Sequence, residues 1–194
     1  FTWDDKAINT VFGEVRLMQG KIIGQMNALG FSAKEEATLT ALTLDVVKSS
    51  EIEGEMLNYD QVRSSIARRL GINTAGLVPG SRHIEGVVEM MLDATQRYNL
   101  PLTEKRLFGW HAALFPTGHS GPYEIEVGKY RTGKMQVVSG AMGKEKVHYE
   151  AVKPGRVKTE MDKFLDWFNN DDKLDAVLKA AIAHFWFIII HPFD

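Results

Sequence analysis

The 194-residue sequence contains no cysteine, which excludes disulfide bonds, thiolate metal ligands and cysteine nucleophiles. It has no large charge excess either, since a formal net charge of -2 gives no broad attraction for nucleic acid or an anionic membrane. The longest apolar stretch, Ala180 to Ile190, contains His184 and is well below the ~20 residues that span a bilayer. No signal peptide is visible, so we expect a cytoplasmic protein without nucleic-acid or membrane partners.

Apolar residues make up 44% of the chain and recur mostly at helical spacing, which predicts a packed helical protein. Ser32 followed by Glu35 is typical of a capping box at a helix start. Asn58 followed by Gln61 indicates a similar helix start. Gly71 is expected to end that helix in a left-handed conformation. The expected helices cover residues 4–29, 32–54, 58–70, 81–92, 103–114, 154–168 and 174–190.

Two segments interrupt the helical pattern. A loop rich in Gly and Pro at 71–80 predicts a boundary between a helical N-terminal region, residues 1–75, and a second region, residues 76–194. Between 118 and 153, glycines surround stretches that favour strands, at 129–131, 135–138 and 146–149. This pattern predicts a small flap built like a β-hairpin.

His191 follows the last apolar helix, and Pro192 disfavours helical backbone at the residue before it, so the helix is expected to end there. An imidazole titrates near neutrality, which suits a general base that takes a proton from an alcohol. Taken alone, such a histidine is more often one that stabilises the helix C-terminus. His184, seven residues earlier, is interpreted as a hydrogen-bonded core residue.

Residues 190–194, Ile-His-Pro-Phe-Asp, resemble the start of the Fic family signature, His-Pro-Phe-x-(Asp/Glu)-Gly-Asn-Gly-Arg, with Asp194 at the x position. The helix over 184–190 is similar to the core helix of that family, and 128–131 with 135–140 is similar to its flap. With the helix over 107–116, the resemblance covers residues 81–194. It implies an all-α, Fic-type helical bundle with a small β-hairpin flap, whose signature continues after Asp194.

A second match is Ser49 to Gly54, which fits the inhibitory pattern of the family, Ser/Thr-x-x-x-Glu-(Gly/Asn). Taken alone, glutamates near a helix end are ordinary solvated residues. Upstream of a histidine motif and a flap, the resemblance implies an inhibitory helix carried by Ser49, Glu53 and Gly54. Residues 1–70 also resemble the helical domain that precedes Fic in many bacterial proteins.

The resemblance implies a protein adenylyltransferase that moves AMP from ATP to a Ser, Thr or Tyr hydroxyl of a target protein or of itself. His191 would be the catalytic base, and Mg²⁺ would be held by an acidic residue just past Asp194, so no metal ligand is assigned in this chain. ATP is expected beside Glu53, Val138, Ser139 and Gly140. The target is expected to add a strand to the flap at Met135, Gln136, Val137 and Val138.

Two other interpretations stay open at this point. Glu53 either restrains the enzyme, by occupying an arginine of the signature that otherwise binds the γ-phosphate, or orients a water that removes AMP from a modified protein. The other reading, from another class, is a non-catalytic helical interaction domain. For the enzyme, the expected partners are a protein substrate with a hydroxyl side chain and ATP, and a homodimer is left open.

Overall fold

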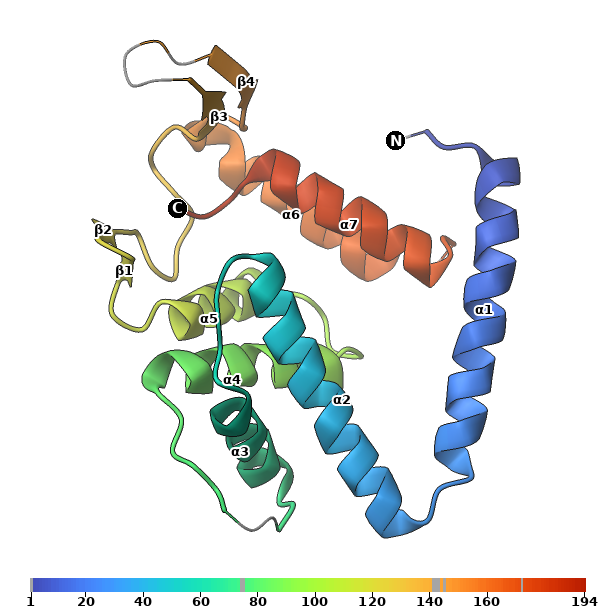
Figure 1. Cartoon of the computed structure of the whole chain (residues 1–194). Helices are drawn as coiled ribbons and strands as arrows, with labels where there is room; N and C mark the ends of the chain where they lie inside the picture. Colours follow the sequence, from blue (N-terminus) through green and yellow to red (C-terminus); the bar gives the residue numbers. More distant parts are fainter. Residues whose placement is uncertain (1, 74–75, 141–143, 145, 172) are drawn as a thin grey trace. The chain divides into compact units, whose positions relative to one another are not determined.

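The computed structural model describes residues 2–73, 76–140, 144, 146–171 and 173–194. The chain forms two compact units, residues 1–80 and 81–194. Both are mostly helical, and small two-stranded sheets occur between the helices of the second unit (Figure 1). The helical fold with a β-hairpin predicted from the sequence is therefore confirmed. Within the described ranges, no helix is long and apolar enough to cross a membrane.

The first unit contains α1 (Asp5–Asn27), α2 (Phe31–Ile52) and α3 (Tyr59–Leu70). Helices α2 and α3 pack against each other through buried side chains that include Leu39 and Val46 on α2, and Val62 and Ile66 on α3. Burial of these aliphatic groups supplies the hydrophobic stabilisation of this pair. Helix α1 has no buried residue in the described part of the chain.

Helix ends in the first unit only partly follow the predicted caps. Asn58 accepts a hydrogen bond from the Gln61 N–H, and Gly71 ends α3 with φ 69°, as predicted. The capping box predicted at Ser32 is wrong, because Gly30 is the N-cap of α2 and makes no side-chain cap bond. A glycine N-cap leaves no sequence signal of the Ser-x-x-Glu kind, which explains the error.

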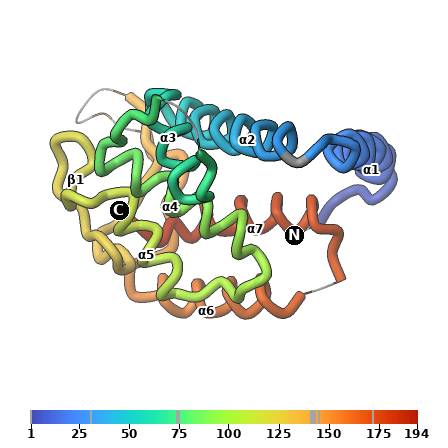
Figure 2. Tube along the Cα trace, turned by 90° about the horizontal axis from the view of Figure 1, so that it is seen from below, coloured from blue at the N-terminus to red at the C-terminus, as the bar shows by residue number. Residues whose placement is uncertain are grey.

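The second unit contains α4 (Arg82–Gln96), α5 (Glu104–Leu114), α6 (Pro154–Asn170) and α7 (Ala176–Ile190). Helices α6 and α7 lie side by side, and α4 packs on α5 (Figure 1, Figure 2). The core of this unit is formed by Leu102, Leu107, Val157, Met161, Phe164, Ala183 and Ile190. His184 is exposed, so its interpretation as a core residue is wrong, because it lies on a face of α7 that this core does not cover.

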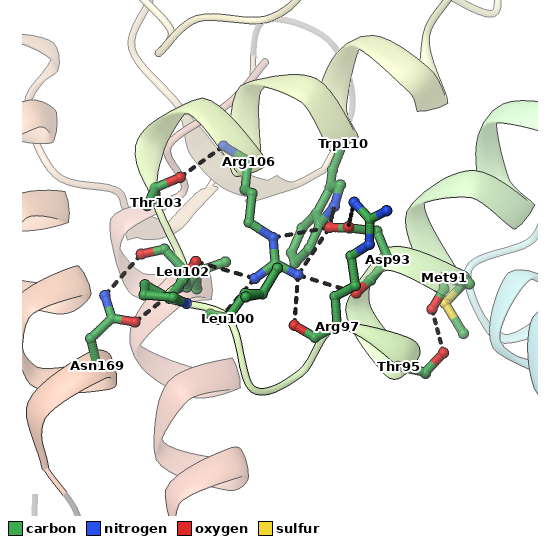
Figure 3. A network of polar contacts seen from close by, with 11 residues as sticks. Met91, Asp93, Thr95, Arg97, Leu100, Leu102, Thr103, Arg106, Trp110 and Asn169 are labelled. Carbon is green, nitrogen blue, oxygen red and sulfur yellow. Dashed lines mark hydrogen bonds and ion pairs between the residues drawn. The ribbon is translucent and has the colours of Figure 1, made fainter.

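Helices α4 and α5 approach closely at Gly86. A Cβ atom added there would lie 1.8 Å from the carbonyl oxygen of Ala113, so only glycine permits this distance. Further along the same two helices, Asp93 accepts hydrogen bonds from Arg106 Nε at 2.9 Å and Trp110 Nε1 at 2.8 Å (Figure 3). The crossing of α4 and α5 is thus fixed by both backbone contact and a partly buried polar network.

Strands are short and antiparallel. The pair β1 (His119–Ser120) and β2 (Tyr123–Glu124) was not predicted, whereas β3 (Gln136–Ser139) and β4 (Lys146–Glu150) form the predicted flap. A register irregularity falls between Val137 and Val138. The strand expected at 129–131 is wrong, because the Arg131 N–H donates to the carbonyl of Pro192 and takes no part in a sheet.

Candidate active site

His191 is the residue that ends α7. Its N–H donates to the Phe187 carbonyl at 2.8 Å, and its own backbone has φ 47° and ψ 67°, the left-handed region. Among the described residues, His191 is the only one other than glycine whose φ is positive. That conformation costs energy for a residue with a side chain and persists only where surrounding contacts fix it. The stop predicted from Pro192 is confirmed, and the contacts around it explain the conformation.

Donors from the flap side of the unit bind the successive carbonyls at this helix end. The Tyr149 hydroxyl donates to Ile189 at 2.5 Å, and the Arg131 guanidinium donates to Ile190 at 3.2 Å and to His191 at 2.5 Å. The Arg131 N–H donates to Pro192 at 2.9 Å. The carbonyls that a helix C-terminus leaves without internal partners are therefore satisfied on both sides of His191.

Arg131 is 2% exposed, and its other guanidinium bonds reach Gly133, at 2.6 Å, and Val152. Burial lowers the pKa of this arginine, and the nearby Asp194 and Tyr149 oppose that shift. In the sequence, Arg131 lies within the flap-like motif at 128–131 and has no predicted role of its own. An arginine among glycines gives no signal that it is buried, because its partners other than Gly133 lie far away in the chain.

The His191 side chain is exposed by surface area, yet the protein packed around it still desolvates the ring. This desolvation lowers the pKa of His191 below its ordinary value of 6.5, and the charge of Arg131 lowers it further. Both effects disfavour the imidazolium form. At neutral pH the imidazole is therefore neutral and able to accept a proton.

The residues after His191 are anchored in the unit. The Phe193 ring stacks on the His111 ring, with centroids 4.4 Å apart and an angle of 11° between the planes. His111 is 5% exposed and accepts a hydrogen bond from the Gly128 N–H at Nδ1, while Asp194 accepts one from the Glu126 N–H at 3.0 Å. These contacts fix the loop on the side of His191 that faces away from α7.

The flap residues predicted to bind target and nucleotide lie in β3 or directly beside one of its ends. The Met135 carbonyl accepts a hydrogen bond from Ala151 at 2.9 Å, which closes the hairpin at its base, and Gln136 begins the strand. Val137 and Val138 are 56% and 46% exposed. At the far end, Ser139 is hydrogen-bonded to His148 at 2.6 Å, and Gly140 has φ 114°.

The predicted inhibitory residues lie at the end of α2. Ser49 is in the last turns of the helix, Glu53 is its C-cap, and Gly54 has φ 86°. The Glu53 side chain is exposed, and no described residue forms an ion pair with its carboxylate. These residues belong to the first unit, whereas His191 and the flap belong to the second. A contact of Glu53 with the site stays a prediction.

The chain matches known families over both units. Residues 101–194 match the Fic/DOC family, and residues 1–72 match DUF4172, a domain of unknown function. A helix that ends in His-Pro-Phe, with a hairpin flap tied to it, thus forms part of a Fic/DOC family domain that follows a DUF4172 region.

The named proteins that resemble this chain are distant in sequence and longer than it. The protein adenylyltransferase Fic of Drosophila willistoni is 27% identical over 165 residues, covering 84% of this chain and 30% of the relative. The protein adenylyltransferase fic-1 of Caenorhabditis elegans is 27% identical over 161 residues, covering 77% of this chain and 28% of the relative. The chain therefore spans less than a third of the length of these relatives.

A solved structure has a similar fold. The crystal structure of a Fic family protein from Desulfovibrio desulfuricans G20 aligns with a TM-score of 0.61 and 24% sequence identity. The alignment covers 100% of this chain and 54% of that chain. The Fic-type fold expected from the sequence is thereby confirmed.

Proposed function

We propose that this chain is part of a protein adenylyltransferase, which transfers AMP from ATP to a Ser, Thr or Tyr hydroxyl of a protein. One observation carries the proposal: within a Fic/DOC family domain, an exposed histidine with a lowered pKa ends a core helix beside a hairpin flap. The distant homology to proteins named protein adenylyltransferases supports the same reaction. The target protein and ATP are the substrates.

In the proposed reaction the target hydroxyl attacks the α-phosphorus of ATP, and His191 takes the hydroxyl proton at its unprotonated ring nitrogen. A bond forms between the target oxygen and that phosphorus, the bond to the oxygen that bridges to the β-phosphate breaks, and pyrophosphate leaves. A neutral imidazole suits this step, since an imidazolium has no lone pair to accept a proton. His191 is thus the proposed general base.

The flap is the proposed docking strand for the target. In the described residues β3 pairs with β4, which leaves the other edge of β3 outside the sheet. An extended target segment would pair with this edge at Met135 to Val138 through backbone hydrogen bonds. Backbone pairing needs no particular side chains, so the target preference is expected to be broad. Val138, Ser139 and Gly140, at the end of the strand, are the proposed nucleotide contacts.

Mg²⁺ is implied by the family resemblance, and its ligand is expected just past Asp194. Among the residues that the structure describes, no group of three or more His, Asp or Glu side chains is placed to hold a metal ion. The described residues do not form a magnesium site by themselves.

Glu53 is the proposed internal inhibitor of the transferase. An exposed carboxylate at the end of α2 is free to pair with an arginine that would otherwise bind the γ-phosphate of ATP. A carboxylate and a phosphate compete for one guanidinium because each can accept two parallel N–H bonds from it. Occupation of that arginine by Glu53 would leave ATP in an unproductive pose.

The test follows incorporation of label from α-labelled ATP into protein by the complete gene product. Glu53→Gly and Glu53→Gln should both raise incorporation, because each removes the competing carboxylate, and γ-labelled ATP should give none. Glu51→Gln is the matched control, since this neighbouring glutamate is paired with Lys48 and should leave the rate unchanged.

Three results would each contradict a part of the proposal. Equal incorporation by all four proteins would remove the inhibitory role of Glu53. Release of AMP from a purified AMP-modified protein, lost in Glu53→Gln, would assign the carboxylate to AMP removal instead. Failure of the complete gene product to bind ATP at all would favour a non-catalytic interaction domain.

A further inference from the structure

The strongest unexplained feature of the second unit is a buried charge without a carboxylate partner in its hydrogen bonds. The described bonds of the Arg131 guanidinium all go to backbone carbonyls, those of Gly133, Val152, Ile190 and His191. Burial of a charged group is costly unless its donors are satisfied. A side chain that only filled space at this position would be apolar.

The four carbonyls belong to two different parts of the unit. Ile190 and His191 are the end of α7, whereas Gly133 lies just before β3 and Val152 just after β4. One rigid, planar guanidinium therefore joins both arms of the hairpin base to the residue that ends the helix. A lysine ammonium, which is a point donor on a flexible stem, cannot reproduce this fork of directions.

We propose that Arg131 is a positioning residue, which fixes the His191 backbone in its left-handed conformation and sets the distance of His191 from the β3–β4 hairpin. The role of His191 as a base comes from the proposed function, whereas the contacts of Arg131 do not depend on it. Tyr149 supports the same arrangement, because its hydroxyl joins β4 to the carbonyl of Ile189.

The consequence for the reaction is geometric. If a target strand pairs with β3, its hydroxyl reaches His191 only while the hairpin base and the end of α7 keep one relative position. A displacement of about 1 Å between a base and the proton that it takes costs on the order of 10²-fold in rate. Loss of Arg131 should therefore lower kcat for AMP transfer by about that factor and leave KM for ATP nearly unchanged.

The test uses a readout that does not require catalysis. The side-chain resonances of His191 are followed by NMR through a pH titration of isotope-labelled protein, and are assigned by comparison with His191→Gln. In Arg131→Gln the pKa of His191 should rise toward about 6.5, because a nearby positive charge is lost and the loosened loop is better solvated. Arg131 is the charge that acts on His191, and Asp194 and Tyr149 act on Arg131 in turn.

Conservative variants keep the test decisive if Arg131→Gln does not fold. Arg131→Lys keeps the charge but not the fork, so the His191 resonances should shift. Tyr149→Phe should shift them less, and Tyr123→Phe, on the exposed β2 strand, is the matched control that should leave them in place. Unchanged His191 resonances in both Arg131→Lys and Tyr149→Phe would overturn the proposal. Displaced resonances in a protein that transfers no AMP would support it and reject the proposed function.

Discussion

At the scale of single residues, His191 combines a local helix stop with carbonyl partners that come from distant parts of the chain. Pro192 directly after an apolar run indicates where α7 ends, since the effect of proline on the preceding backbone is local. The partners of the neighbouring carbonyls, Arg131 and Tyr149, come from 60 and 40 residues away. No spacing rule in the sequence encodes such pairs, because the folded backbone alone brings these distant residues together.

His111 gives a prediction for stability against pH. Burial lowers its pKa from the ordinary 6.5, with Asp194 opposing the shift, and its Nδ1 accepts a hydrogen bond from the Gly128 N–H. The folded state therefore binds fewer protons than the unfolded chain once the pH falls below about 6.5. As a result, the free energy of unfolding decreases as the pH is lowered further. Above that pH both states are neutral and the contribution is constant. His191, whose pKa is also lowered, acts in the same direction.

The measurement is the thermal unfolding midpoint between pH 8 and pH 5, values chosen to bracket the ordinary histidine pKa of about 6.5. His111→Gln keeps an acceptor for Gly128 but does not titrate, so its midpoint should fall less steeply in acid than that of the unaltered protein. His119→Gln, at an exposed position in β1, is the control. If the unfolding midpoint of His111→Gln fell more steeply in acid than that of the unaltered protein, the proposed contribution of His111 to acid sensitivity would be wrong.

At the scale of elements, amphipathic periodicity and local caps indicated most helices, including α3 from Asn58 to Gly71. The flap strands β3 and β4 were also found from composition. The sequence pattern gave a wrong prediction where a tertiary contact determines the backbone conformation. Residues 129–131 favour a strand by residue type, yet the Arg131 N–H donates to the Pro192 carbonyl just after α7. The β1–β2 pair is too short to leave a periodic signal.

Gly86→Ala tests the contact between α4 and α5. The added methyl would meet the backbone oxygen of Ala113, which cannot move aside as a side chain can, so the helices must separate. We expect a loss of about 1–3 kcal/mol in the free energy of unfolding, measured by denaturant titration. Gly109→Ala, in α5 with open space around it, is the matched control and should be neutral or stabilising by about 0.5–1 kcal/mol. Equal effects of the two changes would contradict this packing.

At the scale of the whole molecule, the sequence predicted the family through a motif at one end of the chain and a second motif in the N-terminal region. The family matches over 1–72 and 101–194 agree with that resemblance. Association of Glu53 with His191 is a statement about two units together, and it stays a prediction. The domain boundary that the sequence predicts between residues 75 and 76 also stays a prediction. Local patterns report on segments, and the placement of one unit on another depends on surfaces that no single segment encodes.

The proposed mechanism depends most on one chemical step, proton transfer to His191 in a protein released from inhibition by Glu53. The most direct measurement compares the rate of AMP incorporation from α-labelled ATP by Glu53→Gly and by Glu53→Gly combined with His191→Ala, both in the complete gene product. General-base catalysis contributes on the order of 10² to 10⁴-fold, so the double variant should be slower by at least ~10²-fold. A double variant that labels protein within about twofold of Glu53→Gly would contradict the role of His191 and, with it, the proposed transferase mechanism.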